Sequence, residues 1–275
     1  MKILLILPAA DHLRITKDTP EVPHRKMLRF SVLSLTTLAS LTPEEYSLTI
    51  CDENVEELDL DQSPDVVGIS FMTGLAPRAY ELAKHFHNKG AVTVAGGYHP
   101  TLRTEEAMTH FDCVVAGPAE QVWPKCLKDI EQGSYQSLYR QTTPYKGSDI
   151  PVPKRQLTQK NEKHYITTHA VQTGRGCNHR CKFCSISAFY NQCYYTRPVE
   201  DIIEELEAIP KNFMFVDDNI IADKEYARDL FTRMIPLRKR WTGQCSIELA
   251  DDPELLELAS RSGCKALFVG IETPS

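Results

Sequence analysis

Three closely spaced cysteines, Cys177, Cys181 and Cys184, stand in the stretch QTGRGCNHRCKFCSIS. Thiolates bind zinc and iron–sulfur clusters, so this segment could hold a metal centre. Structural zinc normally takes four ligands, and a fourth would have to come from Cys193 or His179. Three thiolates can instead hold a cluster of four irons, which leaves one iron open to a substrate or cofactor. Three unrelated core cysteines are the remaining alternative, although a polar segment after a strand is a poor place for core residues. The spacing favours the cluster and leaves the other two interpretations open.

The hydrophobic pattern predicts the elements that must position these thiols. Over the first 135 or so residues, short apolar runs alternate with amphipathic stretches. The runs are at 2–8, 47–51, 65–71, 91–97 and 112–117. Most are continuous rather than alternating, which is typical of strands covered on both faces. We therefore expect a doubly wound α/β domain, with a Rossmann-like (flavodoxin-like) parallel sheet, over residues 1–140.

A second βα series is predicted after a break in periodicity. Residues 141–164 hold three prolines and many polar side chains, which predicts a linker. Residues 165–275 then show strand patterns at 168–174, 213–218, 243–249 and 265–273, the first three each followed by a helical pattern. Four βα steps in one direction predict part of a (β/α) barrel, with its chemistry at the carboxyl ends of the strands. No helix follows the fourth strand, so we expect an incomplete barrel, from a fragment or a truncated relative.

Composition excludes some functions and indicates a compartment. The formal net charge is −6 and there is no long basic run, which argues against nonspecific binding of nucleic acid. Nine cysteines, an odd number, in a chain too large to need disulfide staples fit a reducing compartment, so we expect the cytoplasm. No stretch approaches the ~18 apolar residues of a membrane span.

The cysteine motif is similar to that of a known superfamily. CxxxCxxC with an aromatic residue before the final cysteine, just after the first strand of a βα barrel, resembles the signature of the radical S-adenosylmethionine enzymes. The resemblance implies that Cys177, Cys181 and Cys184 hold a 4Fe–4S cluster and that S-adenosylmethionine chelates its fourth iron. It also implies an electron donor such as flavodoxin or ferredoxin, which drives cleavage of the sulfonium to a 5′-deoxyadenosyl radical.

The same resemblance predicts the residues that contact S-adenosylmethionine. They are Phe183, Asp217, Asp218, Asn219, Glu248 and Glu272. The phenylalanine matches the aromatic position near the adenine. The stretch FVDDN stands where the superfamily often has Gly-Gly-Glu against the methionyl amine, although acidic residues there can also cap the next helix. The two glutamates are expected on the third and fourth strands, where family members contact the ribose or methionyl part.

The amino-terminal domain carries a second resemblance. VAGGYHPT followed by DCVVAGPAE is similar to the cobalamin-binding domain of the cobalamin-dependent radical S-adenosylmethionine enzymes, with Pro118 and Ala119 replacing part of the last motif. Glycines at a strand end let backbone amides approach a ligand, and open α/β sheets bind ligands at that edge. The residues expected at cobalamin are Ser70, Thr73, Gly74, Gly96, Gly97 and His99. The Asp-x-His-x-x-Gly segment is absent, so the resemblance implies cobalamin without a histidine from that motif beneath its cobalt, and we expect His99 to form the turn. The competing interpretation is that the two glycines only make a tight turn.

Together these resemblances imply methyl transfer to an unactivated carbon. One S-adenosylmethionine would methylate cobalamin, and a second would generate the radical that opens the substrate C–H bond. Two alternatives stay open: a radical enzyme with an empty first domain that performs a ring rearrangement or cyclisation, and a noncatalytic fragment or binding module. The substrate, a small molecule or a peptide, is not specified by the sequence.

Overall fold

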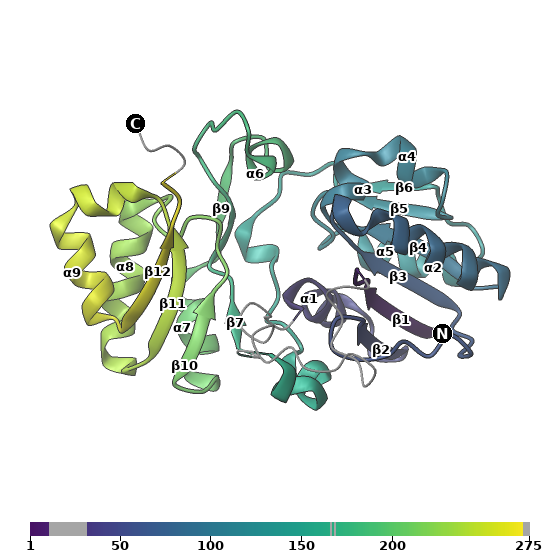
Figure 1. Ribbon diagram of the computed structural model, residues 1–275, viewed down its shortest axis with the longest axis horizontal. Helices are drawn as coiled ribbons and strands as arrows, with labels where there is room; N and C mark the ends of the chain where they lie inside the picture. Colours follow the sequence, from purple (N-terminus) through teal and green to yellow (C-terminus); the bar gives the residue numbers. More distant parts are fainter. Residues whose placement is uncertain (11–31, 166, 168, 272–275) are drawn as a thin grey trace. The chain divides into compact units, whose positions relative to one another are not determined.

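The computed structural model describes residues 1–10, 32–165, 167 and 169–271 (Figure 1). The chain divides into two compact units, Met1–Tyr145 with Pro151–Ile166, and Lys146–Ile150 with Thr167–Ser275. The segment predicted as a linker thus contributes to both units, and the predicted domain boundaries stay predictions. Residues 141–164 include two 3₁₀ helices, η4 (Gly147–Asp149) and η5 (Arg155–His164).

The amino-terminal unit is built on a six-stranded parallel sheet: the five predicted strands and one further strand that the sequence does not predict. Its strands are β1 (Lys2–Leu7), β2 (Ser47–Asp52), β3 (Val66–Ser70), β4 (Val92–Gly96), β5 (Cys113–Ala116) and β6 (Leu138–Arg140). Their order in the sheet is β2-β1-β3-β4-β5-β6, and every neighbouring pair is parallel. The first five strands follow the doubly wound order of flavodoxin-like folds, with β6 added at one edge.

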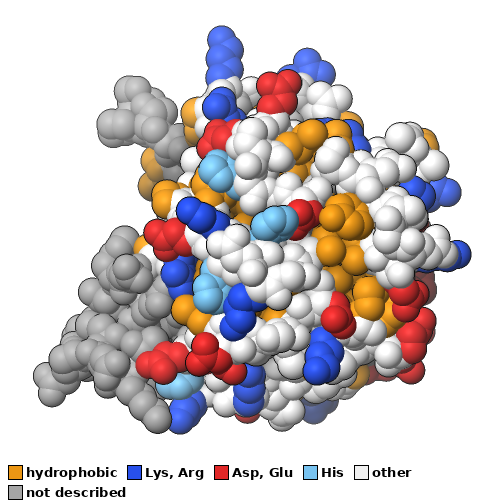
Figure 2. Space-filling view, turned by 90° about the vertical axis from the view of Figure 1, so that its right-hand side faces the viewer, with side chains coloured by type: hydrophobic (Ala, Val, Ile, Leu, Met, Phe, Trp, Pro, Cys, Tyr) orange, Lys and Arg blue, Asp and Glu red, His pale blue; other side chains and the backbone are white. Residues whose placement is uncertain are grey.

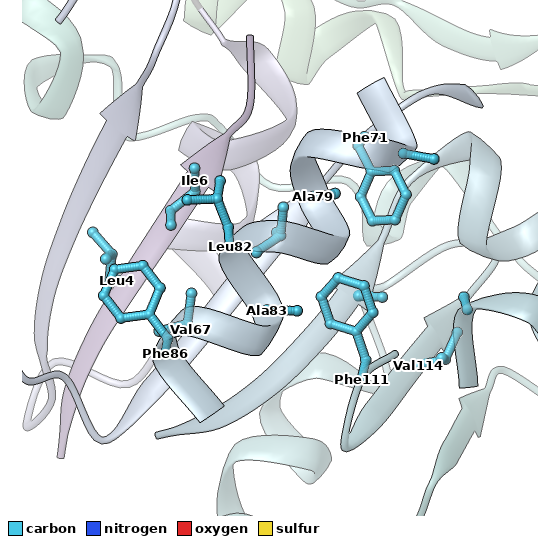
Figure 3. Packing of buried hydrophobic residues seen from close by; sticks show 14 of the residues in the cluster. Leu4, Ile6, Val67, Phe71, Ala79, Leu82, Ala83, Phe86, Phe111 and Val114 are labelled. Carbon is cyan, nitrogen blue, oxygen red and sulfur yellow. The ribbon is translucent and has the colours of Figure 1, made fainter. Parts of the chain in front are cut away.

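Helices cover both faces of this sheet. They are α1 (Leu33–Leu41), η3 (Thr73–Leu75), α2 (Ala76–Asn88), α3 (Tyr98–Leu102), α4 (Thr104–Met108) and α5 (Trp123–Glu131). Alternate side chains of β1 enter opposite cores: Leu4 and Ile6 pack with α2, as Figure 3 shows, whereas Leu5 packs with α1 and α5. A strand buried on both faces needs apolar side chains at consecutive positions, which explains the unbroken hydrophobic runs.

The carboxyl-terminal unit holds a four-stranded parallel sheet in the order β12-β11-β10-β7. Its strands are β7 (Ala170–Val171), β10 (Asn212–Phe215), β11 (Arg240–Cys245) and β12 (Cys264–Val269), and a separate antiparallel pair is formed by β8 (Gly174–Gly176) and β9 (Tyr194–Thr196). Its helical segments are α6 (Ser185–Phe189), α7 (Val199–Ala208), α8 (Lys224–Met234), η6 (Ile235–Leu237), η7 (Ile247–Asp251) and α9 (Pro253–Arg261). Four parallel strands, the first three each followed by helix, confirm the predicted strand–helix alternation.

One core fills the space between this sheet and its helices. Trp241 is fully buried, and its ring lies 5.2 Å from the rings of both Phe215 and Phe231, centroid to centroid. Two aspartates start the helices that follow: Asp223 accepts a hydrogen bond from the first turn of α8, and Asp252 does so for α9. The apolar faces of both helices pack in this core against the sheet whose carboxyl edge carries the cysteine segment.

Two surface properties complete the description. On the face shown in Figure 2, acidic and basic side chains are interspersed, so no single sign of charge dominates there. Within the described ranges, no helix has the length and apolarity needed to cross a membrane.

Candidate functional site

The cysteine segment lies at the carboxyl edge of the second unit. Cys177 directly follows β8 and Cys184 is the residue before α6, while the Cys184 N–H donates to the Cys181 carbonyl at 3.1 Å. All three are free thiols; Cys181 is exposed and the other two are half-buried. Burial raises the pKa of the Cys177 thiol, and the backbone N–H of His179 and the Asn219 side chain partly offset that rise.

The donor set, more than its present arrangement, fits an iron–sulfur cluster. Three thiols on one accessible polar segment are the ligands that a 4Fe–4S cluster takes. Among the residues that the structure describes, no group of three His, Cys, Asp or Glu side chains is placed to hold a metal ion. The assignment of the three cysteines as ligands of a cluster stays a prediction.

Asp217 ties the cysteine segment to the sheet. Its side chain is buried, with 2% of its surface exposed, at the end of β10. One carboxylate oxygen accepts hydrogen bonds from the Thr173 N–H at 3.0 Å, the Thr173 hydroxyl at 2.6 Å and the Gly174 N–H at 2.7 Å. Burial raises the pKa of this carboxyl to about 6, although the hydrogen bonds oppose the shift. Asp217 thus fixes the turn between β7 and β8, three residues before the first cysteine.

Its two neighbours make further connections along the same edge. The Gly176 N–H donates to a carboxylate oxygen of Asp218 at 3.3 Å, and burial raises the pKa of that carboxyl to about 6. The side-chain amide oxygen of Asn219 accepts from the N–H groups of Ile221 and Ser246, at 3.4 and 3.1 Å. The residue that caps the next helix, α8, is Asp223 rather than Asp217 or Asp218. Contact of these three residues with S-adenosylmethionine stays a prediction.

The remaining residues expected at S-adenosylmethionine have different positions. Glu248 was expected on the third strand, but β11 ends at Cys245 and Glu248 lies in η7. There its carboxylate lies 3.6 Å from Nε2 of His179, within the cysteine segment. Phe183 is 73% exposed. Glu272 lies outside the described residues.

The carboxyl edge of the first sheet gathers the residues expected at cobalamin. Ser70 ends β3, Gly96 ends β4, and Thr73 and Gly74 lie in η3. A Cβ atom placed on Gly74 or Gly96 would meet no atom within 4 Å, so open space adjoins both glycines. This edge has the uncrowded backbone that a large ligand such as cobalamin requires, and the residues present fit that group.

Gly97 and His99 instead support this edge from beneath. Gly97 has φ +97°, and a Cβ there would lie 2.9 Å from backbone atoms of Phe71. His99 is buried, with 3% of its surface exposed, and both ring nitrogens contact side chains of the unit. Two residues that the sequence did not single out hold these edges: the Thr101 hydroxyl joins Gly97 to Gly117, and the Thr173 hydroxyl donates to Asp217. Thr101 is part of the GGYHPT stretch, whereas nothing in the sequence marked Thr173.

Comparisons with known proteins agree with both halves of this description. The family model for the B12 binding domain matches residues 34–127, and that for the Radical SAM superfamily matches residues 171–275. The chain is 30% identical over 252 residues to the bacteriochlorophyllide d C-12(1)-methyltransferase of Chlorobaculum tepidum, covering 88% of this chain and 55% of that protein. It is 26% identical over 298 residues to the hopanoid C-2 methylase of Rhodopseudomonas palustris, covering 99% and 54%. The chain thus spans just over half the length of these curated relatives.

A solved structure shows the same fold. The radical S-adenosylmethionine methyltransferase TsrM from Kitasatospora setae superposes with a TM-score of 0.71 at 16% identity, over 99% of this chain and 60% of that one. The predicted fold class and the resemblance drawn from the CxxxCxxC and GGYHPT motifs are confirmed. The radical SAM domain implies a 4Fe–4S cluster and S-adenosylmethionine, and the B12 binding domain implies cobalamin. Each half of the chain thus matches one family model: residues 34–127 match the B12 binding domain, and residues 171–275 match the Radical SAM superfamily.

Proposed function

We propose that this chain is the cofactor-binding part of a cobalamin-dependent radical S-adenosylmethionine methyltransferase that acts on an unactivated carbon. The observation that carries the proposal is the combination of two edges in one chain: three free thiols at one carboxyl edge, and an uncrowded glycine edge on a B12 binding domain. Both curated relatives described above are methyltransferases by name, which favours methyl transfer over a ring rearrangement or cyclisation.

The bound groups supply the reactive chemistry: the cluster with S-adenosylmethionine supplies one-electron cleavage and hydrogen abstraction, and cobalamin carries the methyl group. The chain supplies position. Cys177, Cys181 and Cys184 would hold the cluster, while the bonds of Asp217 keep the preceding turn in place. Glu248, beside His179, would contact a cationic or hydroxyl-bearing part of S-adenosylmethionine. An external one-electron donor completes the requirements.

The test is anaerobic purification of the 275-residue chain with iron, sulfide and hydroxocobalamin. We expect about four irons per chain, as a single 4Fe–4S cluster requires, together with a corrin absorption band. The matched control is the triple variant Cys177→Ala, Cys181→Ala, Cys184→Ala, which should lose the iron and keep the corrin. Release of 5′-deoxyadenosine from S-adenosylmethionine under reducing conditions then reports radical chemistry. Tightly bound zinc at the three thiols, with no uptake of iron, would overturn the proposal.

A further inference from the structure

Four side chains form a hydrogen-bonded series at the carboxyl edge of the first sheet. Nε2 of His99 lies 2.8 Å from the Tyr80 hydroxyl, and Nδ1 lies 3.1 Å from the Thr73 hydroxyl. The Tyr80 hydroxyl also lies 3.0 Å from a carboxylate oxygen of Glu106. The Phe71 ring packs 5.5 Å from the imidazole, centroid to centroid, and limits its rotation. The series therefore runs Thr73–His99–Tyr80–Glu106 through a fixed, buried ring.

The acidic end sets the direction of these hydrogen bonds. Arg103 and Tyr80 hold the pKa of Glu106 below its usual value, so at neutral pH the group is a carboxylate and only accepts. The Tyr80 hydroxyl must then donate to Glu106; burial and this carboxylate raise the pKa of Tyr80 to about 12, so it keeps its proton. Having one proton, the hydroxyl can only accept from His99, which places the imidazole proton on Nε2.

The rest of the series follows from this tautomer. An imidazole that carries its single proton on Nε2 has a bare Nδ1. Bare Nδ1 is an acceptor, and the Thr73 hydroxyl donates to it. With its proton committed, that hydroxyl has only lone pairs to offer another partner. Thr73 is exposed in η3, next to Gly74, where the structure leaves open space. The edge thus presents an oriented acceptor toward any ligand that occupies it.

A ligand that suits this acceptor carries N–H donors on its rim, and the corrin ring of cobalamin is surrounded by primary carboxamides. We propose that His99 is a positioning residue that makes the Thr73 hydroxyl a dedicated hydrogen-bond acceptor for a corrin carboxamide. The inference rests on the proposed binding of cobalamin by this unit. It gives His99 a role that needs no contact with cobalt, since both of its ring nitrogens already have partners.

The test has two readouts, both on the 275-residue chain. The first is the tautomer of His99 in the cobalamin-free protein, from long-range ¹H–¹⁵N NMR assigned by comparison with His99→Gln. We expect the proton on Nε2, and a proton on Nδ1 would overturn the inference without touching the proposed function. The second is the dissociation constant for hydroxocobalamin, measured by absorbance titration.

Matched variants make the second readout specific. Thr73→Val removes the hydroxyl at constant shape, so cobalamin should bind roughly five- to tenfold more weakly, the usual effect of one net hydrogen bond. Thr73→Ser keeps the hydroxyl and should bind as wild type does. His99→Asn can still accept from Thr73 at the Nδ1 position and should retain most of the affinity, whereas His99→Gln retains only the Tyr80 side and should resemble Thr73→Val. Wild-type affinity in both Thr73→Val and His99→Gln would overturn the inference alone. Failure of the wild type to bind hydroxocobalamin would overturn the inference and the proposed function together.

Discussion

Asp217 offers the sharpest test of how the sheet holds the cysteine segment. Asp217→Ala would leave three buried donors without an acceptor: two backbone N–H groups, of Thr173 and Gly174, and the Thr173 hydroxyl. At about 1–2 kcal/mol for each unsatisfied buried group, the lost hydrogen bonds should lower the free energy of unfolding by about 3–6 kcal/mol, partly offset by removal of the buried charge. That is a large part of the roughly 5–15 kcal/mol that stabilises a typical domain.

The matched control is Asp217→Asn. Its amide oxygen can keep the shortest bonds, and its neutral side chain removes the cost of burying a charge, so we expect a loss of no more than about 1 kcal/mol. Thr173→Ala removes only the hydroxyl donor and should lose about 1 kcal/mol as well. Asp217→Ala should therefore be much less stable than Asp217→Asn and Thr173→Ala, because it alone removes the acceptor.

The assay must report on one unit, because a chain of two units need not unfold in a single transition. The two tryptophans make this possible, since Trp123 is buried in the first unit and Trp241 in the second. In a Trp123→Phe background, urea unfolding followed by fluorescence reports Trp241 alone. If Asp217→Ala unfolded at the same urea concentration as its parent, the reasoning would be refuted, because the three donors would then lose no stability without the carboxylate.

Three further predictions concern the stability of the two units and the properties of their cofactor sites. First, burial raises the pKa of Asp217 to about 6, above that of an unfolded aspartate, so protonation favours the folded state: this stabilisation is complete below about pH 4 and is lost as pH rises through about 6. The free energy of unfolding reported by Trp241 should therefore fall across that range relative to Asp217→Asn, by an amount on the order of 3 kcal/mol, and parallel pH profiles would contradict it. Second, Asn219→Leu removes the amide beside the Cys177 sulfur, so the cluster should have a more negative reduction potential in an EPR-monitored titration at unchanged iron content; an unchanged potential would count against this contact. Third, Gly97→Ala should destabilise the first unit by about 1–3 kcal/mol, measured by Trp123 fluorescence in a Trp241→Phe background. Gly96→Ala, at a position with open space, should keep the stability and weaken binding of hydroxocobalamin.

The sequence predicted the long strands well because burial on both faces leaves a clear pattern. In β1 every position from Ile3 to Ile6 enters one core or the other, and the unbroken apolar run follows directly. The short elements were predicted less well: β6, β8 and β9, of three residues each, were not predicted, and the two-residue β7 lies within the longer strand predicted at 168–174. Segments of that length carry no measurable periodicity, and their pairing depends on contacts with distant parts of the chain.

The predicted position of Glu248 on the third strand is wrong for a specific physical reason. The sequence pattern extended the third strand to residue 249, but β11 ends at Cys245 because the next backbone N–H, of Ser246, donates to the Asn219 side chain rather than continuing the strand. The chain then turns into η7 and carries Glu248 toward His179. The residue types at the site could be read from motifs, whereas contacts such as that between Thr173 and Asp217, 44 positions apart, could not.

Both units meet the same requirement at their carboxyl edges. Where parallel strands end, backbone N–H and C=O groups leave the sheet and need new partners. In the first unit the Thr101 hydroxyl donates to the Gly97 carbonyl at 2.8 Å and accepts from the Gly117 N–H at 2.9 Å, so one side chain joins two loops. In the second, Asp217 accepts from Thr173 and Gly174.

Such residues belong to the same motifs as the residues expected to touch cofactors, yet their polar atoms are already engaged by the protein. A motif position therefore has one of two functions, which the structure separates and the sequence does not. Positions with open space, such as Gly74 and Gly96, are free to face a ligand. Positions with engaged polar atoms, such as Thr101 and Asp217, hold the loops that do so. Substitutions of the second kind should therefore lower the stability of their own unit even when no cofactor is present, whereas substitutions of the first kind should lower only ligand affinity.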